Sequence, residues 1–374
     1  MIKKKELRYS IAIVSILIVY GIWKMNHGVD AHFQAELTTT ENKNVEILLK
    51  NMQTNCIGRY LIDLPKSYYI AENSQININE SKITTSRIYL PAFEQRVRLR
   101  EQQLRTTATI NPEDIPYLKK TYPLPLGLTG IIFERVESPG THDAFRVLET
   151  HLYSNGVAIK IETEFTNAMA DRYENKRKST PSVYVNTAPE RMSELTDLLS
   201  RIQGRAEDEV PTTAGTCIPN AFVSDNGKDK EEIDLLFRSD NDSQLRFGVS
   251  TDNFTKEKDS LLERSDDIWK NLLSSNGDIL RRGVRKINKL DTEELLAAGK
   301  YSSNDNKRYD FILLTNEKTG GIKSPVFSLE LLNDELTPSP YNQKEIVSFW
   351  DAISQTLRVR PGAFSLSQGW PSDS

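Results

Sequence analysis

The sequence predicts an α+β protein of two similar domains, each a mostly antiparallel sheet with helices on one face, after an N-terminal transmembrane helix. Three observations lead to this prediction. The chain has 374 residues, 38% hydrophobic and 27% charged, which is typical of globular proteins and of about two domains. Strand-like and helix-like patterns occur twice, without the strict alternation of a parallel sheet. One uncharged apolar run lies near the N-terminus.

Residues 1–30 are predicted to be a signal anchor. Basic residues precede the apolar run over 9–23, and Lys24 follows it. The nearest cleavage-like site, at Ala31, lies several residues late, which favours an uncleaved anchor over a cleaved signal peptide. The positive-inside rule then places the body in the periplasm of a Gram-negative cell. A buried core helix is the third interpretation, and it would leave the basic residues packed beside an apolar segment.

The rest of the chain divides into a tether, two domains and a tail. Residues 31–53 are polar and form the tether, with at most one short helix. We expect an N-terminal domain over 54–205 and a C-terminal domain over 216–363, joined by a linker over 206–215 that contains Pro, Thr and Gly. Residues 364–374 are expected to be a flexible tail.

The two domains follow one plan. Each opens with a short apolar stretch led by a cysteine and ends with an amphipathic helix. In the first domain we expect strands over 82–90, 130–137, 144–153 and 157–165, and helices over 93–104 and 192–202. In the second we expect strands over 244–250, 309–315 and 325–333, and helices over 258–273 and 346–357. The alternative is one larger α+β unit in which similar elements recur by chance.

No motif of catalysis or metal binding is found in the sequence. It has four histidines and contains no H-E-x-x-H, G-x-S-x-G or Walker loop. His142 and Asp143 could begin a catalytic triad, but their Pro-Gly-Thr-His-Asp context favours an exposed turn. Paired carboxylates have no sequence signature, so an envelope hydrolase that uses them stays an alternative. We expect no enzyme activity, no cofactor and no metal.

Arginines on the first predicted helix form the candidate partner-binding site. Arg98 and Arg105 each follow a glutamate by four residues, which is the favourable order for a helical ion pair. Arg96 and Arg100 remain, one turn apart on a shared ridge. They belong either to a solvated helix face or to a basic patch for an acidic protein partner. With 48 basic against 52 acidic residues, the whole chain does not resemble a nucleic-acid binder.

Cys56 and Cys217 are the only cysteines. An exported compartment permits a disulfide, and closing a loop of about 160 residues would contribute on the order of 5 kcal/mol in the chain-entropy model. However, equivalent positions of two repeats belong to separate cores. We therefore expect two buried free thiols that act as small apolar residues, with the disulfide as the alternative.

The stretch from Cys56 to Pro65, CIGRYLIDLP, resembles the opening motif of immunity proteins that neutralise type VI secretion lipase effectors, of the kind paired with family-four phospholipase effectors. CIPNAF from Cys217 and the segment from Phe349 to Ala363 resemble the two ends of that family's C-terminal domain. The matching residues are structural in character: Cys56, Gly58, Arg59, Asp63, Pro65, Cys217, Trp350, Arg358, Arg360 and Pro361.

The resemblance implies a periplasmic, membrane-tethered inhibitor with N- and C-terminal immunity domains. Its partner would be a cognate type VI lipase effector, whose active site or lid it would occlude, and residues 9–23 would hold it in the inner membrane. We expect a monomer when free and no nucleic-acid partner. An envelope scaffold or chaperone, which would bind several partners weakly, is a further alternative.

Overall fold

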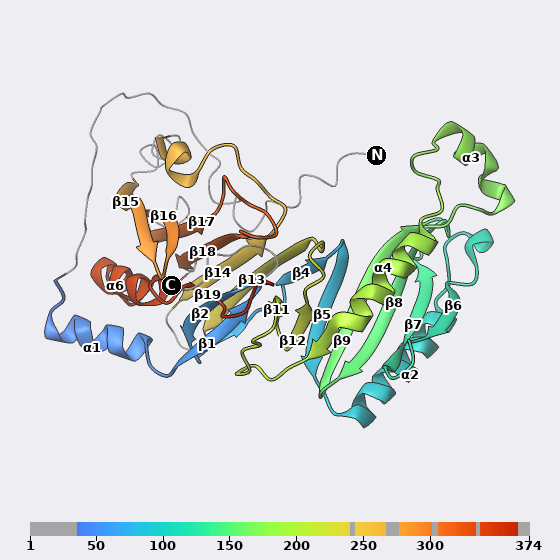
Figure 1. Cartoon of the computed structure of the whole chain (residues 1–374), viewed down its shortest axis with the longest axis horizontal. Coiled ribbons are helices and arrows are strands. Elements are labelled where there is room, and N and C mark those ends of the chain that lie inside the picture. The colour runs from blue at the N-terminus through green and yellow to red at the C-terminus, as the bar shows by residue number, and fades with distance from the viewer. Residues whose placement is uncertain (1–35, 240–243, 267–276, 301–305, 334–336, 366–374) are drawn as a thin grey trace. The chain divides into compact units, whose positions relative to one another are not determined.

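The computed structural model describes residues 36–239, 244–266, 277–300, 306–333 and 337–365 (Figure 1). The chain forms two compact units, and each is built from two separate stretches. Unit 1 joins the chain up to Ser74 with Ile233–Pro361, and unit 2 joins Gln75–Glu232 with the segment that begins at Gly362.

Unit 2 contains an antiparallel sheet with the strand order β6-β7-β8-β9-β5-β4. Its strands are β4 (Gln75–Ile78), β5 (Ser81–Arg87), β6 (Leu118–Pro123), β7 (Thr129–Val136), β8 (Phe145–Ser154) and β9 (Val157–Thr166). Its helices are α2 (Leu90–Thr106), α3 (Glu174–Ser179) and α4 (Ala188–Arg201), with short 3-10 turns at η1 (Pro112–Asp114) and η2 (Asp171–Tyr173).

Unit 1 contains a sheet with the order β15-β16-β17-β18-β14-β13, and a short strand β3 pairs with β13. Its strands are β3 (Tyr68–Ile70), β13 (Glu231–Ser239), β14 (Leu245–Asp252), β15 (Asp278–Ile287), β16 (Leu290–Lys300), β17 (Lys307–Thr315) and β18 (Val326–Asn333). Its helices are α1 (Thr39–Leu48) and α6 (Gln343–Ser354). Residues 261–266 are also helical, and the remainder of the helix predicted over 258–273 lies outside the described residues.

The two large sheets have the same strand order, with β6 to β9 in the places of β15 to β18 and the β4–β5 pair in the place of β13–β14. Each unit also has a small antiparallel sheet. In unit 1 it is formed by β1 (Met52–Ile57), β2 (Tyr60–Pro65) and β19 (Arg358–Val359), and in unit 2 by β11 (Gly215–Ile218), β12 (Ala221–Ser224) and β10 (Ile202–Gly204). The topology therefore supports a duplicated plan.

The strands that open each half of the sequence are exchanged between the units. The cysteine-led hairpin β1–β2 pairs with β19, which follows the last helix of the chain. The corresponding hairpin β11–β12 pairs with β10, which follows α4 of the first half. The compact units thus cross the domain boundaries expected at 54–205 and 216–363, because the opening strands find their hydrogen-bond partners outside their own half.

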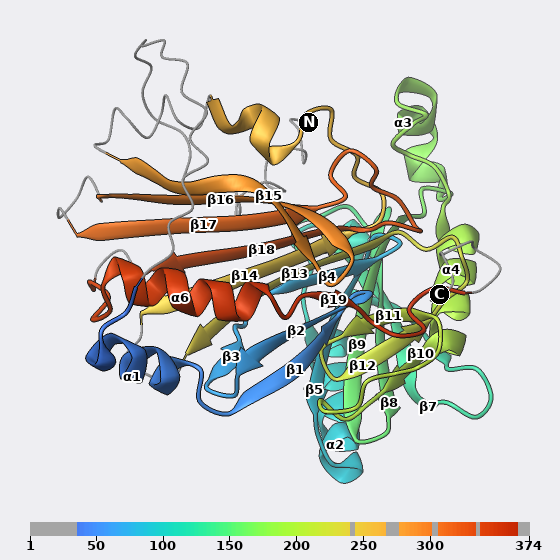
Figure 2. The same cartoon turned by 60° about the vertical axis from the view of Figure 1, so that its left-hand side comes forward.

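Helices cover both faces of the sheet in unit 2, and the prediction of helices on one face is wrong there. The six consecutive residues Val147–Leu152 of β8 are all buried, although neighbouring side chains on a strand point to opposite faces. Both faces must therefore be covered. Figures 1 and 2 show α4 on one side of this sheet and α2 on the other.

In unit 1, α6 packs an aromatic face against the sheet. Phe349 and Trp350 are fully buried and form edge-to-face contacts with Phe247 and Phe311 at ring-centroid distances of 5.6 and 5.9 Å. The helix α1 lies along α6 (Figure 2), and each helix begins with a capping box. Asn44 donates to Glu345 Oε1 at 2.6 Å, so the end of the predicted tether is fixed to the body.

Neither cysteine is a free thiol, because Cys56 and Cys217 are both disulfide-bonded. The expectation of two buried free thiols is wrong, although both residues are buried. That expectation assumed that each cysteine lies in the core of its own half. In the structure the Cys56 strand belongs to the unit formed mainly by the second half, and the Cys217 strand belongs to the other unit.

The predicted anchor over 9–23 lies outside the described residues, as does nearly all of the tail over 364–374. Within the part of the chain that the structure describes, no helix combines the length and apolar character needed to cross a membrane.

We predict that the compact units, and not the halves of the sequence, are the folding units. A fragment of residues 75–232 retains β4 to β12 and should unfold cooperatively in urea. A fragment of residues 54–205 should not, since it carries β1 and β2 without β19 and lacks β11 and β12. Circular dichroism of both fragments in reductant measures this. Cooperative unfolding of the second fragment but not the first would contradict the assignment.

Candidate functional site

Most of the residues that carry the family resemblance meet in the small sheet of unit 1. Arg358 lies opposite Leu61 across the β19–β2 ladder, and its side chain bonds to Asp63 Oδ1 at 3.0 Å. Arg59 and Arg360 are each only 1% exposed, and the Arg360 N–H donates to the Arg59 carbonyl at 2.9 Å. These residues join the β1–β2 hairpin to β19, which lies about 300 residues later in the sequence. Their role is therefore structural.

The other residues of this motif also serve the fold. Gly58 has φ +57°, and a Cβ at this position would lie 2.6 Å from Thr251 Cγ2, so only glycine fits. Pro65 is buried and Pro361 is exposed at the end of β19. Trp350 donates its indole N–H to Glu294 Oε1 at 2.8 Å, and Glu294 also binds Arg281 and Arg285.

The helix α2 carries the candidate partner-binding arginines and has three distinct faces. Phe93 and Leu104 are buried against the sheet of unit 2. On the solvent side, Arg98 pairs with Glu94 and Arg105 with Glu101, as the four-residue spacing predicts. A third stripe lies between these faces and consists of Ala92, Gln95, Arg96, Leu99, Arg100 and Gln103. This set is the α2 stripe.

Arg100 at the edge of the α2 stripe is held by a buried carboxylate. Its Nε and Nη2 atoms each donate to Glu149 at 2.7 Å in a bidentate pair. Glu149 lies on β8, is 0% exposed, and also accepts from Arg135 Nε at 2.5 Å, while His151 Nε2 lies 2.9 Å away. Arg100 therefore fixes α2 on the sheet, and its binding capacity is largely used inside the protein.

The charge of Glu149 is strongly stabilised in the folded protein. Burial by itself would raise the pKa of this carboxyl, but the hydrogen bonds from Arg100, His151 and Arg135 outweigh it and hold the pKa well below its usual range. The cluster is thus a permanent ionic connection between helix and sheet at neutral pH.

Arg96 differs from the other three arginines of α2. Its side chain is exposed, and its hydrogen bond among the described residues is a 3.2 Å donation to Ser86 Oγ. Arg98, Arg100 and Arg105 each have a carboxylate within 4 Å, and among the described residues Arg96 has none. It is the arginine of this helix whose charge remains available to a partner.

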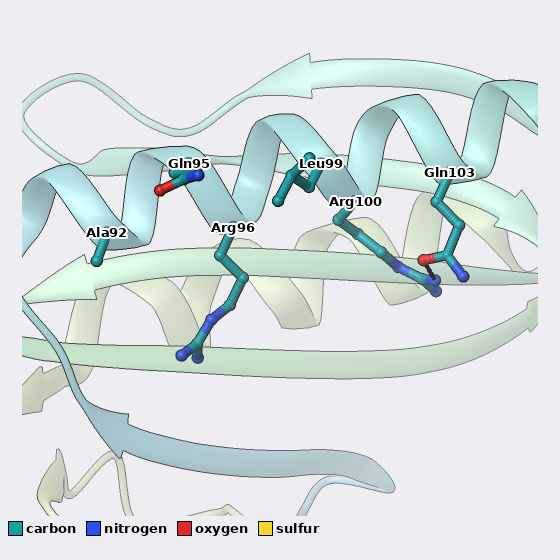
Figure 3. Close-up of a pocket in the computed structure, with 6 residues that line it drawn as sticks. All are labelled: Ala92, Gln95, Arg96, Leu99, Arg100 and Gln103. Atoms are coloured by element: carbon teal, nitrogen blue, oxygen red, sulfur yellow. Dashed lines mark hydrogen bonds between the residues drawn. The ribbon is translucent and has the colours of Figure 1, made fainter.

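The α2 stripe borders a shallow depression of about 450 Å³. Figure 3 shows the Arg96 and Arg100 side chains directed over the neighbouring strands, with Leu99 between them along the helix. Leu99 is 58% exposed and Tyr89, just before the helix, is 86% exposed. An unpaired cation therefore lies beside apolar groups that face water.

His142 and Asp143 do not form the beginning of a catalytic triad. The Asp143 carboxylate accepts from Lys119 Nζ and Tyr173 OH, both at 2.7 Å, and from Arg172. Burial alone would raise the pKa of Asp143, but these hydrogen bonds hold it below its usual value. His142 instead lies 3.0 Å from Lys176 Nζ. The exposed-turn interpretation fits better.

One buried carboxylate pair has raised pKa values. Asp310 and Glu330 lie on the neighbouring strands β17 and β18, and burial raises the pKa of both. Burial is the main cause for Glu330, and the neighbouring Asp310 carboxylate raises the pKa of Glu330 further because it opposes ionisation. The hydrolase alternative expects a pair of this kind. Among the described residues, no group of His, Cys, Asp and Glu is arranged to hold a metal ion.

Glu149 and its donors were not predicted from the sequence. The signal was present, because Glu149 interrupts the apolar part of the strand predicted over 144–153, and such a charge needs a buried partner. Nothing in the sequence specified that the partners are Arg100 from the helix and Arg135 from the preceding strand.

We predict that Glu149→Gln lowers the free energy of unfolding at pH 7 by about 3–5 kcal/mol, because two arginines lose their buried counter-charge. Since the folded pKa of Glu149 is depressed, its stabilisation is fully present above the unfolded pKa of about 4.5 and declines as the pH falls below it. The difference from wild type should therefore shrink in acid.

Urea unfolding at several pH values measures this effect. The control is Glu101→Gln, which removes the exposed pair with Arg105 and should cost about 0.5 kcal/mol. Equal losses in the two variants would show that the Glu149 cluster is not a special support of the fold.

Comparison with solved structures gives related folds. One is described as the apo structure of immunity protein TplEi of T6SS from Pseudomonas aeruginosa, with 23% identity and a TM-score of 0.65, covering 84% of this chain and 99% of that one. Another is described as the crystal structure of the Tle4-Tli4 complex, with 22% identity and a TM-score of 0.66 over the same shares. At these identities the likeness shows the fold.

Comparison with protein families gives two matches. Residues 53–205 match the Tle cognate immunity protein 4 N-terminal domain, and residues 209–362 match its C-terminal domain. A comparison with curated proteins gives no match. The two family matches together extend over most of the chain and confirm the resemblance seen in the opening motifs. The chain belongs to the Tle cognate immunity protein 4 family.

Proposed function

We propose that this protein binds a lipase effector of a type VI secretion system and inhibits it by occlusion of its active site or lid. Membership of a family of cognate immunity proteins carries the proposal. A related solved structure is described as a Tle4-Tli4 complex, in which the immunity protein is bound to its effector. Inhibition of this kind requires a stable complex and no chemical step by the inhibitor.

The geometry of the charged clusters agrees with a role in binding. Glu149 and Glu294 are buried and each is neutralised by two arginines, so they act as supports rather than as free acids or bases. Inhibition by binding needs no acid–base step, so the Asp310–Glu330 pair is not required for the function of a cognate immunity protein. The exposed α2 stripe is a surface to which a partner protein can bind.

We further propose that the body works in the periplasm on an N-terminal anchor over residues 9–23. The basic residues before this uncharged run support an anchor with the body exported. The disulfide-bonded state of Cys56 and Cys217 also supports an oxidising compartment. The packing of α1 on α6 would then join the tether to the body at a fixed place.

We predict that the protein protects cells against a lipase sent to the periplasm. We expect a neighbouring gene to encode a hydrolase with a G-x-S-x-G motif, and its product is the test toxin. Cells that make both proteins should survive, and the two should co-purify as a complex. Survival that does not depend on the immunity protein, or two proteins that never associate, would contradict the proposal.

The location is tested with exchanged N-terminal segments. Replacing residues 1–30 by an unrelated signal anchor should keep protection, because the segment serves export and attachment. Deleting residues 1–30 should abolish protection and leave both cysteines reduced, since the cytosol is reducing. Both thiols should then react with an alkylating reagent once the protein is denatured, because they are buried in the folded state. Full protection by the deleted form would contradict the periplasmic location.

A further inference from the structure

Three of the four arginines of α2 form ion pairs within the protein, and Arg96 does not among the described residues. Arg98 and Arg105 have helical ion-pair partners, and Arg100 is bound by Glu149. The single side-chain hydrogen bond found for Arg96 among the described residues is to a neutral hydroxyl, Ser86 Oγ at 3.2 Å. The uncompensated positive charge of the helix is thus concentrated at one position in the α2 stripe.

Two apolar side chains lie beside this position on the helix. Ala92 lies one turn before Arg96 and Leu99 nearly one turn after it, and both line the depression of about 450 Å³. Leu99 is 58% exposed, which leaves much of a large apolar side chain in water. Arginine is enriched at the centre of protein interfaces. An exposed apolar side chain such as Leu99 also gains free energy when a partner removes it from water.

The support beneath this surface is rigid. The bidentate pair between Arg100 and the fully buried Glu149 fixes the helix against β8, and Phe93 packs on Tyr153 of the same strand at a centroid distance of 5.4 Å. A surface held in this way loses little conformational freedom when a partner binds, which favours affinity.

We propose that the α2 stripe is a contact surface for the lipase effector, and that it receives a partner segment in which a carboxylate lies beside an apolar side chain. The carboxylate would accept hydrogen bonds from the Arg96 guanidinium, and the apolar side chain would cover Leu99 and Ala92. This inference rests on the proposed function, because it takes the lipase as the occupant. Arg100 is a positioning residue and does not itself bind the partner.

Two charge reversals on the same helix test the inference. Arg96→Glu should weaken binding of the neighbouring-gene lipase by roughly 30-fold, since it removes the favourable charge and opposes the partner's carboxylate. Arg98→Glu makes the same change in net charge at a 69% exposed side chain outside the stripe, and should change affinity less than threefold. Leu99→Ser should also weaken binding, by roughly tenfold, because the partner would no longer bury a large apolar side chain.

Calorimetric titration gives the affinities, and thermal unfolding checks that the variants are folded. Added salt should weaken the wild type and Arg98→Glu more than it weakens Arg96→Glu, because the attractive pair is absent in the latter. Equal affinity of wild type, Arg96→Glu and Leu99→Ser would overturn the inference and leave the proposed function intact. Failure of the wild type to bind the lipase would contradict both.

Discussion

The buried carboxylate of Glu149 connects the helix α2 to the sheet of unit 2, and the candidate surface depends on it. Two arginines and a histidine surround it, so its charge persists although the side chain is 0% exposed. The cost of burying a charge is met only when all partners are in place. Glu149 therefore helps Phe93 and Leu104 to hold α2 on the sheet. It also binds Arg100, whereas Arg96 has no carboxylate partner among the described residues.

A similar arrangement occurs in unit 1. Glu294 on β16 is bound by Arg281 and Arg285 from β15 and by Trp350 from α6. In both units a carboxylate on an inner strand joins a neighbouring strand to a helix. The common strand order of the two sheets shows that the units share one plan. In each unit, a cysteine-led hairpin from one half of the sequence pairs with a strand from the other half.

Local patterns in the sequence were sufficient to predict many of the helices and strands. The alternation around the Ser154-Asn155-Gly156 turn predicts the hairpin of β8 and β9, and both Asn155 and Gly156 have the positive φ of such a turn. Non-local features were not predictable. The strand β16 contains the helix-favouring Glu-Glu-Leu-Leu-Ala-Ala, and only pairing with β15 and β17 makes it a strand. The disulfide-bonded cysteines and the pairing of Arg100 with Glu149 depend likewise on the tertiary fold.

The most direct test of the account is to locate the effector on α2. A photoreactive benzoylphenylalanine placed at Leu99 lies in the α2 stripe, and the same residue placed at Glu94 lies on the ion-paired side of the helix. Illumination of the complex with the neighbouring-gene lipase should give a cross-link from position 99 and little from position 94. Cross-linking from position 94 alone, or from neither position in a complex that is otherwise intact, would contradict the account.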